Sequence, residues 1–140
     1  MAGLLPERPR GLLASALYDA ELLRSAQRDG YLLTWARPPA IWFQLDALLC
    51  SKISALGVYI IWRNGRWIRV GQGDIGDRLS DHQNDPEITA HRQFGTLYAT
   101  WATAPAVLMD GIERYLAEQI QPAVGQRFPD VPPVRVNLPA

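Results

Sequence analysis

The sequence predicts an α+β fold, an α/β sandwich in which a small three-stranded antiparallel sheet is flanked by helices. Residues 57–71 have the β-branched and aromatic content of two strands, and Asn64-Gly65 between them tolerates the positive φ values of a tight hairpin turn. Residues 97–104 form the third predicted strand. Because helical patterns precede, separate and follow these strands, we expect helices to cover the sheet.

Four segments have the pattern of helices. In the first, leucines recur at a helical spacing and Gly30 supplies the stop. Asp74 is a good N-cap for the third helix. Pro105 suits the first position of the fourth, and Pro122 ends it. The four helices are expected over residues 10–29, 41–50, 75–84 and 105–121.

The length of 140 residues suits one domain with a single core. Residues 1–52 are expected to form an N-terminal helical extension packed on this core, and residues 53–125 to form the core itself. Residues 126–140 form a Pro-rich C-terminal tail, in which Val134 to Leu138 is a candidate edge strand. No internal repeat interrupts this organisation.

The charge balance gives no support for a nucleic-acid partner by itself. The chain has 14 basic and 14 acidic residues, whereas proteins that bind nucleic acid without sequence preference usually carry a basic excess. A case for such a partner must therefore come from the local placement of arginines.

Cysteine use and hydropathy indicate a cytoplasmic protein that does not enter a membrane. Cys50 is the only cysteine, so an intramolecular disulfide is excluded. The apolar stretch near the N-terminus is interrupted by Arg10, Asp19 and Glu21, which fits neither a signal peptide nor a membrane span.

The hairpin carries the first candidate functional residues. Side chains alternate along a strand, so Trp67, Arg69 and Gly71 are expected to share one face of the second strand. The turn brings the two strands together, and we expect Tyr59 and Arg69 on the same side of the sheet. A buried strand tyrosine with a structural role is the ordinary alternative for Tyr59.

The helices add three more candidates. Arg78 and His82 are four residues apart and project from one helix face. Glu113 lies beside the apolar stripe of the last helix. Taken singly, each of these has an ordinary explanation as a solvated helix residue.

Taken together, these segments resemble the GIY-YIG nuclease family. Gly57-Val58-Tyr59 is followed by Arg69-Val70-Gly71-Gln72-Gly73, then by Arg78 with His82, and then by Glu113 on a helix that ends at Pro122. The resemblance covers about half of the chain, from Ile53 to Gly125. It implies a GIY-YIG-like nuclease domain over residues 53–125.

The resemblance also implies roles in catalysis. Glu113 would bind a hard cation, Mg²⁺ or Mn²⁺, which takes oxygen ligands and keeps most of its waters. Arg78 would contact the scissile phosphate. Tyr59, or a water that it holds, would be the general base or position the nucleophile, and His82 would assist proton transfer.

Four residues are the candidates for substrate binding. They are Arg69, Gly71, Gln72 and His91. His91 has the alternative of an ordinary loop histidine.

Two positions depart from the family pattern. Arg69 stands in place of the second motif tyrosine, and Gly125 stands where a late asparagine is expected, with Asn137 too distant to replace it. If Arg69 faces Tyr59, its charge is expected to lower the pKa of that phenol.

Three functions follow as alternatives. The first is a metal-dependent endonuclease that hydrolyses phosphodiester bonds, with DNA expected rather than RNA. The second is a catalytically impaired GIY-YIG-like domain that binds nucleic acid or a protein. The third is a small interaction protein in which the N-terminal segment with Trp35 and Trp42 forms a homodimer or a partner surface.

Overall fold

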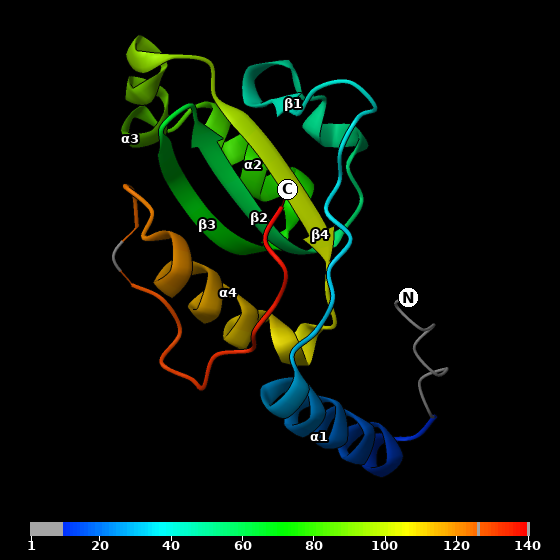
Figure 1. Ribbon diagram of the computed structural model, residues 1–140. Coiled ribbons are helices and arrows are strands. Elements are labelled where there is room, and N and C mark those ends of the chain that lie inside the picture. Colours follow the sequence, from blue (N-terminus) through cyan, green and yellow to red (C-terminus); the bar gives the residue numbers. More distant parts are fainter. Residues whose placement is uncertain (1–9, 126, 140) are drawn as a thin grey trace.

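The computed structural model describes residues 10–125 and 127–139, and it confirms the α+β class (Figure 1). Residues 1–9 of the expected N-terminal extension lie outside this part. The helices and strands, in chain order, are α1 (Leu12–Asp29), β1 (Phe43–Gln44), β2 (Leu56–Arg63), β3 (Arg66–Asp74), α2 (Ile75–Gln83), α3 (Pro86–Thr89), β4 (Tyr98–Thr103) and α4 (Ala106–Ile120). Short 3-10 turns occur at Leu45–Ala47, Cys50–Lys52 and Ala90–Phe94.

The sheet has four strands in the described chain, one more than predicted. Their order is β1-β4-β2-β3, and every neighbouring pair is antiparallel. The additional strand is β1, whose two residues pair with β4. β2 and β3 form the predicted hairpin, and Gly65 in its turn has a φ of 85°. β3 is therefore an edge strand.

The predicted helix over residues 41–50 is wrong. Phe43 pairs with β4, and the residues that follow form two 3-10 turns. The backbone there finds partners outside a helix, because the Gln83 side-chain amide donates to the carbonyls of Leu45 and Leu48 at 2.8 and 3.0 Å. A short apolar run does not reveal such a distant partner.

The other helix boundaries follow the local signals. Gly30 ends α1 with a φ of 82°, and its N–H donates to the carbonyl of Ala26. The Asp74 side chain caps α2 by accepting from the Asp77 N–H at 3.1 Å. Pro105 lies one position earlier than predicted, as the N-cap of α4.

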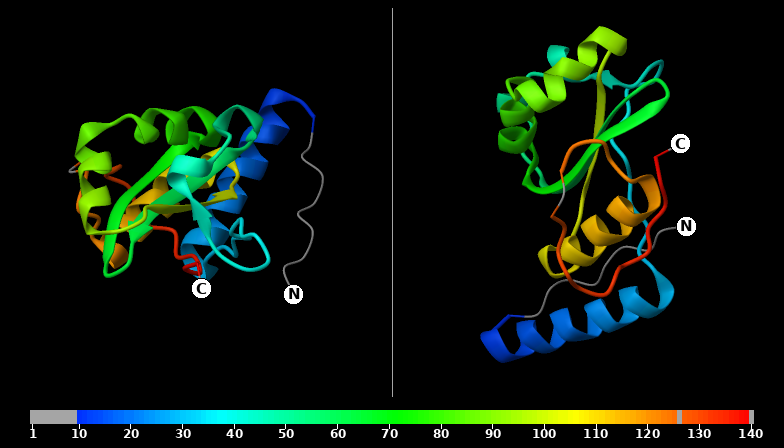
Figure 2. Two further views of the ribbon diagram at one scale, coloured as in Figure 1. Left: turned by 90° about the horizontal axis from the view of Figure 1, so that it is seen from above. Right: turned by 90° about the vertical axis from the view of Figure 1, so that its left-hand side faces the viewer.

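The sheet separates two apolar cores. Figures 1 and 2 show α2 and α4 on opposite faces of it. Successive β2 residues alternate between the faces. The core on the α4 side includes Val58, Ile60, Val70, Leu108 and Ile112, and the core on the α2 side includes Tyr59, Ile61, Ile68, Ile75 and Leu79.

The C-terminal segment is part of the α4-side core. Val134 is fully buried, and its N–H donates to the carbonyl of Gly111 at 2.9 Å. A Cβ at Gly111 would lie 2.6 Å from Cγ2 of Val134, so this contact requires glycine. Of the candidate edge strand, the structure shows a single parallel bridge between Val136 and Tyr31.

α1 lies beside α4 and away from the sheet (Figure 2). Ala26 is its one buried residue, while Leu12 and Leu13 are 93% and 76% exposed. None of the helices in the described ranges is both long and apolar enough to cross a membrane.

Candidate functional site at the edge strand

A β-bulge decides which face of the sheet Arg69 occupies. Near the turn, Trp62 pairs with Trp67, but the next pair is Ile61 with Arg69. Ile68 is therefore an extra residue on β3. Such a bulge shifts the strand pairing by one position and redirects the side chains beyond it.

The bulge places Arg69 on the same face as Tyr59. With unshifted pairing Arg69 would stand opposite Ile60, whose side chain points into the α4-side core. The expectation that Tyr59 and Arg69 share one face of the sheet is confirmed. The reason is the bulge, which interrupts the regular alternation of side chains along β3. The expectation that Trp67 shares this face is wrong, since Trp67 packs against the α4-side core.

Two motif glycines permit close packing in the hairpin. A Cβ at Gly57 would overlap the backbone of Ala102 on β4. A Cβ at Gly71 would overlap the ring and hydroxyl of Tyr59, which is the cross-strand neighbour of Gly71. Gly71 thus has a structural role in making room for the tyrosine, and its part in substrate binding stays a prediction.

Tyr59 forms a buried pair with His82 of α2. The Tyr59 hydroxyl lies 2.5 Å from Nε2 of His82, and the two side chains are 0% and 7% exposed. Burial raises the pKa of Tyr59, although the charges of Arg69 and Arg78 act in the opposite direction. Arg69 thus acts on the pKa of Tyr59 in the expected direction, but desolvation outweighs the nearby charges and the net pKa is raised.

His82 is neutral at physiological pH. Its pKa is lowered to about 4, first by burial and then by the charges of Arg69 and Arg78, while Asp85 and Asp81 act to raise it. The protonated phenol of Tyr59 then donates to Nε2, which leaves the imidazole proton on Nδ1. The Asp85 carboxylate lies 4.0 Å from that Nδ1.

Arg69 and Arg78 supply two guanidinium groups beside this pair. Both favour the ionised form of the Tyr59 hydroxyl and so act to lower its pKa. Nε of Arg69 is buried and has no hydrogen-bond partner within the described chain. A Cβ at Gly125 would lie 2.5 Å from Nη1 of Arg69. Arg69 and Gly125, the two positions at which the sequence departs from the motifs it resembles, are thus neighbours in space.

Carboxylates gather on the α4 side of β3. The Gln72 side-chain amide donates to Oε2 of Glu113 at 2.6 Å and to Oδ1 of Asp110 at 2.7 Å. Burial is the main cause of the raised pKa of Glu113, and the neighbouring Asp110 adds to it. The Gln72 hydrogen bond and the charges of Arg69 and Arg78 oppose this shift.

These oxygens suit a hard cation. Mg²⁺ and Mn²⁺ are commonly held by one or two carboxylates together with water. No cluster of three or more potential metal ligands occurs among the described residues, so Glu113 and Asp110 would be the protein's contribution. Sequence reasoning missed Asp110, although its place three residues before Glu113 puts both on one helix face.

The candidate site thus joins both faces of the edge strand. The charges of Arg69 and Arg78 act on the pKa values of Tyr59, His82 and Glu113 alike. His91 is different: it lies on the Ala90–Phe94 turn, where its ring centroid is 6.3 Å from that of Phe94. No contact of the described residues draws His91 into the cluster.

Comparisons of the chain with protein-family models, with curated proteins and with solved structures found no match.

Proposed function

We propose that this protein is a metal-dependent endonuclease of the GIY-YIG type, which hydrolyses phosphodiester bonds in DNA. One observation carries the proposal. Two arginines, Arg69 and Arg78, flank a neutral tyrosine–histidine pair, and a carboxylate pair lies across the same edge strand. This combination offers phosphate binding, proton transfer and cation binding together.

Arg78 and Arg69 would bind the scissile phosphate. A guanidinium is permanently charged and matches phosphate oxygens in a bidentate geometry. Arg78 is exposed, and Nε of Arg69 still has donor capacity. Both groups would stabilise the additional negative charge that the phosphate acquires in the transition state.

Tyr59 and His82 would move the proton of the attacking water. As the water oxygen bonds to phosphorus, its proton passes to the Tyr59 oxygen, and the Tyr59 proton passes to Nε2 of His82. The resulting imidazolium faces Asp85 through Nδ1. Tyr59 has no exposed surface, so we infer that the two guanidinium groups turn from its hydroxyl towards the phosphate when substrate binds.

Glu113, assisted by Asp110, would hold Mg²⁺ or Mn²⁺. When bound, the cation would supply positive charge for the leaving oxygen. Gln72 orients both carboxylates through its amide. In metal sites of proteins, residues that hydrogen-bond to the metal ligands commonly fix the orientation of those ligands in this way.

Plasmid cleavage tests the proposal. Supercoiled DNA is incubated with Mg²⁺ or Mn²⁺ and with the wild type, Glu113→Ala or Arg78→Ala. Loss of either group should reduce cleavage by about 100-fold or more. Glu118→Ala is the matched control, because Glu118 lies on the same helix, is exposed and pairs with Arg114 at 2.7 Å. If Glu113→Ala and Arg78→Ala cleave as well as the control, the nuclease proposal is lost.

One observation favours a second function, a binding module that retains the phosphate site. Arg69 replaces a motif tyrosine, and the remaining Tyr59 is fully buried. Binding of DNA that depends on Arg78, without cleavage by the wild type in either metal, would select this alternative.

A further inference from the structure

A row of aromatic side chains crosses the sheet at its hairpin end. Trp62 of β2 pairs in register with Trp67 of β3 and with Tyr98 of β4. Both ring-centroid distances from Trp62 are 5.9 Å. Trp42 adds a fourth ring, edge-on to Trp62 at 5.2 Å. We call these four residues, Trp42, Trp62, Trp67 and Tyr98, the aromatic row.

The aromatic row is partly open to solvent. Each of its four side chains is half-buried. In Figure 1, α4 covers the other end of this sheet face, and no helix lies over the hairpin end. Residues 62–67 also line a hollow of about 340 Å³ at the turn. The rings therefore cover the core on one side and present an aromatic surface to solvent on the other.

Arginines outnumber acidic residues in the segments that build the aromatic row. The segments that build it, residues 30–45, 56–73 and 95–105, contain no Asp or Glu. They contain four arginines, Arg37, Arg63, Arg66 and Arg69, of which Arg69 points to the opposite face of the sheet, beside Tyr59. These segments, two of which end before Asp46 and Asp74, therefore carry a basic excess in sequence.

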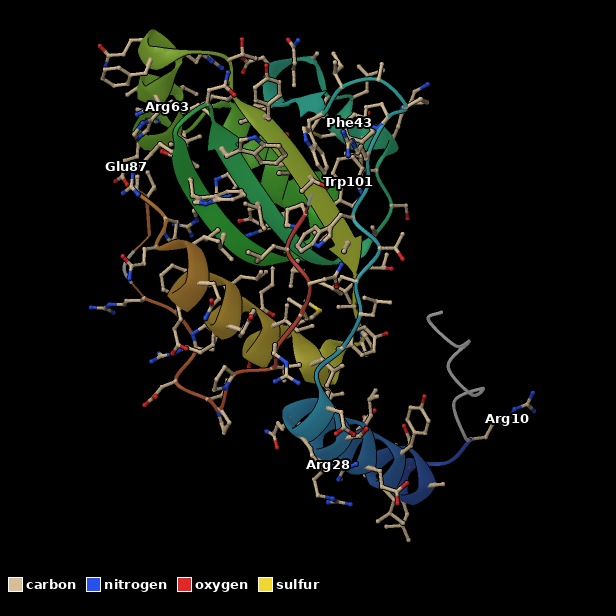
Figure 3. The ribbon with its side chains drawn as sticks, in the orientation of Figure 1. Arg10, Arg28, Phe43, Arg63, Glu87 and Trp101 are labelled. Carbon is tan, nitrogen blue, oxygen red and sulfur yellow. The ribbon has the colours of Figure 1, made fainter. Side chains whose placement is uncertain are left out.

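Two of these arginines also contact aromatic rings. The Arg37 guanidinium carbon lies 4.5 Å from the ring centroid of Trp42. Arg63, labelled in Figure 3, lies at the hairpin end of the sheet, with its guanidinium carbon 4.9 Å from the Phe94 ring centroid. Aromatic rings interleaved with arginines are the usual composition of surfaces that bind single-stranded nucleic acid.

We propose that the aromatic row is a stacking platform for unpaired bases, and that the preferred substrate has a single-stranded segment next to the cut. Every base offers a π-face to a tryptophan or tyrosine, while arginines meet the backbone phosphates. A folded partner protein fits less well, because the arginines would need a matching acidic surface, whereas every nucleotide carries its own negative charge.

The location of the aromatic row supports this substrate class, and here the inference rests on the proposed function. Trp67 precedes Arg69 by two residues and Gln72 by five on the same strand. At about 3.3 Å per residue these separations are about 7 and 17 Å. A strand with bases on the row therefore reaches the carboxylates beside Gln72, on the same face of the sheet, within a few nucleotides, while Arg69 lies around the edge of β3 on the other face.

Binding in the absence of cleavage tests the platform separately from the nuclease. The cleavage-deficient Glu113→Ala protein is titrated in EDTA with a labelled 12-nucleotide oligo-dT, and with a duplex of the same length. We expect tighter binding of the single strand, quenching of tryptophan fluorescence, and an affinity that falls as salt rises.

Trp42→Leu and Arg37→Ala, placed in the same background, test the surface without altering a strand of the hairpin. Trp42→Leu should weaken single-strand binding by about 10-fold or more. The matched control is Trp101→Leu, because Trp101 stacks on Phe43 at 4.9 Å and belongs to the α2-side core. Circular dichroism establishes that each variant is folded.

The outcomes separate this inference from the proposed function. Equal binding by Trp42→Leu, Arg37→Ala and the control, or tighter binding of the duplex, would overturn the platform even if the wild type cuts plasmid. Platform-dependent binding by a wild type that cuts nothing would retain the platform and remove the nuclease.

Discussion

The Tyr59 hydroxyl and Nε2 of His82 lie 2.5 Å apart in a setting where burial favours the neutral form of both groups. The short hydrogen bond gives a proton a direct route from the phenol to the imidazole. The same burial makes the imidazolium unfavourable until a negative phosphate arrives. The pair is thus matched to a reaction in which negative charge accumulates beside Arg69 and Arg78.

We expect His82 to make the fold sensitive to mild acid. Its pKa of about 4 lies below its ordinary value of 6.5, so the unfolded chain takes up the proton first as pH falls. The free energy of unfolding should therefore decline between pH 6.5 and 4, by up to about 3 kcal/mol. Urea denaturation of the wild type and His82→Gln across this range measures the difference. Parallel declines would show that His82 is not the cause.

We expect Glu113→Gln to stabilise the protein while abolishing cleavage. The raised pKa of Glu113 means that the folded state favours its neutral form, so its carboxylate weakens the fold above the ordinary pKa. The melting temperature of the variant should exceed that of the wild type at pH 7, and the gain should vanish below pH 4.5. Glu118→Gln, which removes an ordinary ion pair with Arg114, should give no such gain.

Adding Mg²⁺ to the same melting-temperature measurement tests whether Glu113 binds a metal ion. A ligand that binds the folded state alone raises its stability, so millimolar Mg²⁺ should raise the melting temperature of the wild type more than that of Glu113→Gln. An equal response in both proteins would contradict the assignment of Glu113 as a metal ligand.

Features with local causes were predictable from the sequence. Asn64-Gly65 fixes a turn, Asp74 caps a helix and Gly30 ends one, because each acts through its own backbone or its immediate neighbours. The same locality explains why Arg78 and His82 were correctly placed on one helix face.

Features with distant causes were not predictable. The segment at 41–50 depends on the amide of Gln83, and the burial of Val134 depends on the absence of a side chain at Gly111. The bulge at Ile68 has no sequence signal that we recognise. The raised pKa of Tyr59 was not predictable either, since the burial that outweighs the Arg69 charge comes from elements distant in sequence.

Gly71→Ala should be strongly destabilising for steric reasons. The added Cβ would overlap the ring and hydroxyl of Tyr59, and crowding of this kind typically costs about 1–3 kcal/mol. In the double variant with Tyr59→Leu, the Gly71→Ala cost should shrink, and a double-mutant cycle from urea denaturation measures this coupling. If the two effects simply add, the glycine serves some purpose other than making room for Tyr59.

Arg69 should contribute to cleavage as a phosphate contact that depends on Gly125. Arg69→Gln is expected to lower kcat/KM by about 100-fold. Arg92→Gln is the matched control. Arg92 lies outside the cluster and forms an ion pair with Asp46, with 2.6 Å between the two side chains. Unchanged cleavage by Arg69→Gln would leave this residue without a part in the reaction.

Gly125→Ala provides the corresponding test from the other side of the contact. Its Cβ would lie 2.5 Å from Nη1 of Arg69, so the guanidinium must move and cleavage should fall. The φ of 99° at Gly125 adds a backbone penalty of about 1–2 kcal/mol, which denaturation measures separately. In the Arg69→Gln background, Gly125→Ala should retain the backbone penalty and have little further effect on cleavage. An equal loss of cleavage in both backgrounds would mean that Gly125 acts through the backbone, and that Arg69 is not the group it positions.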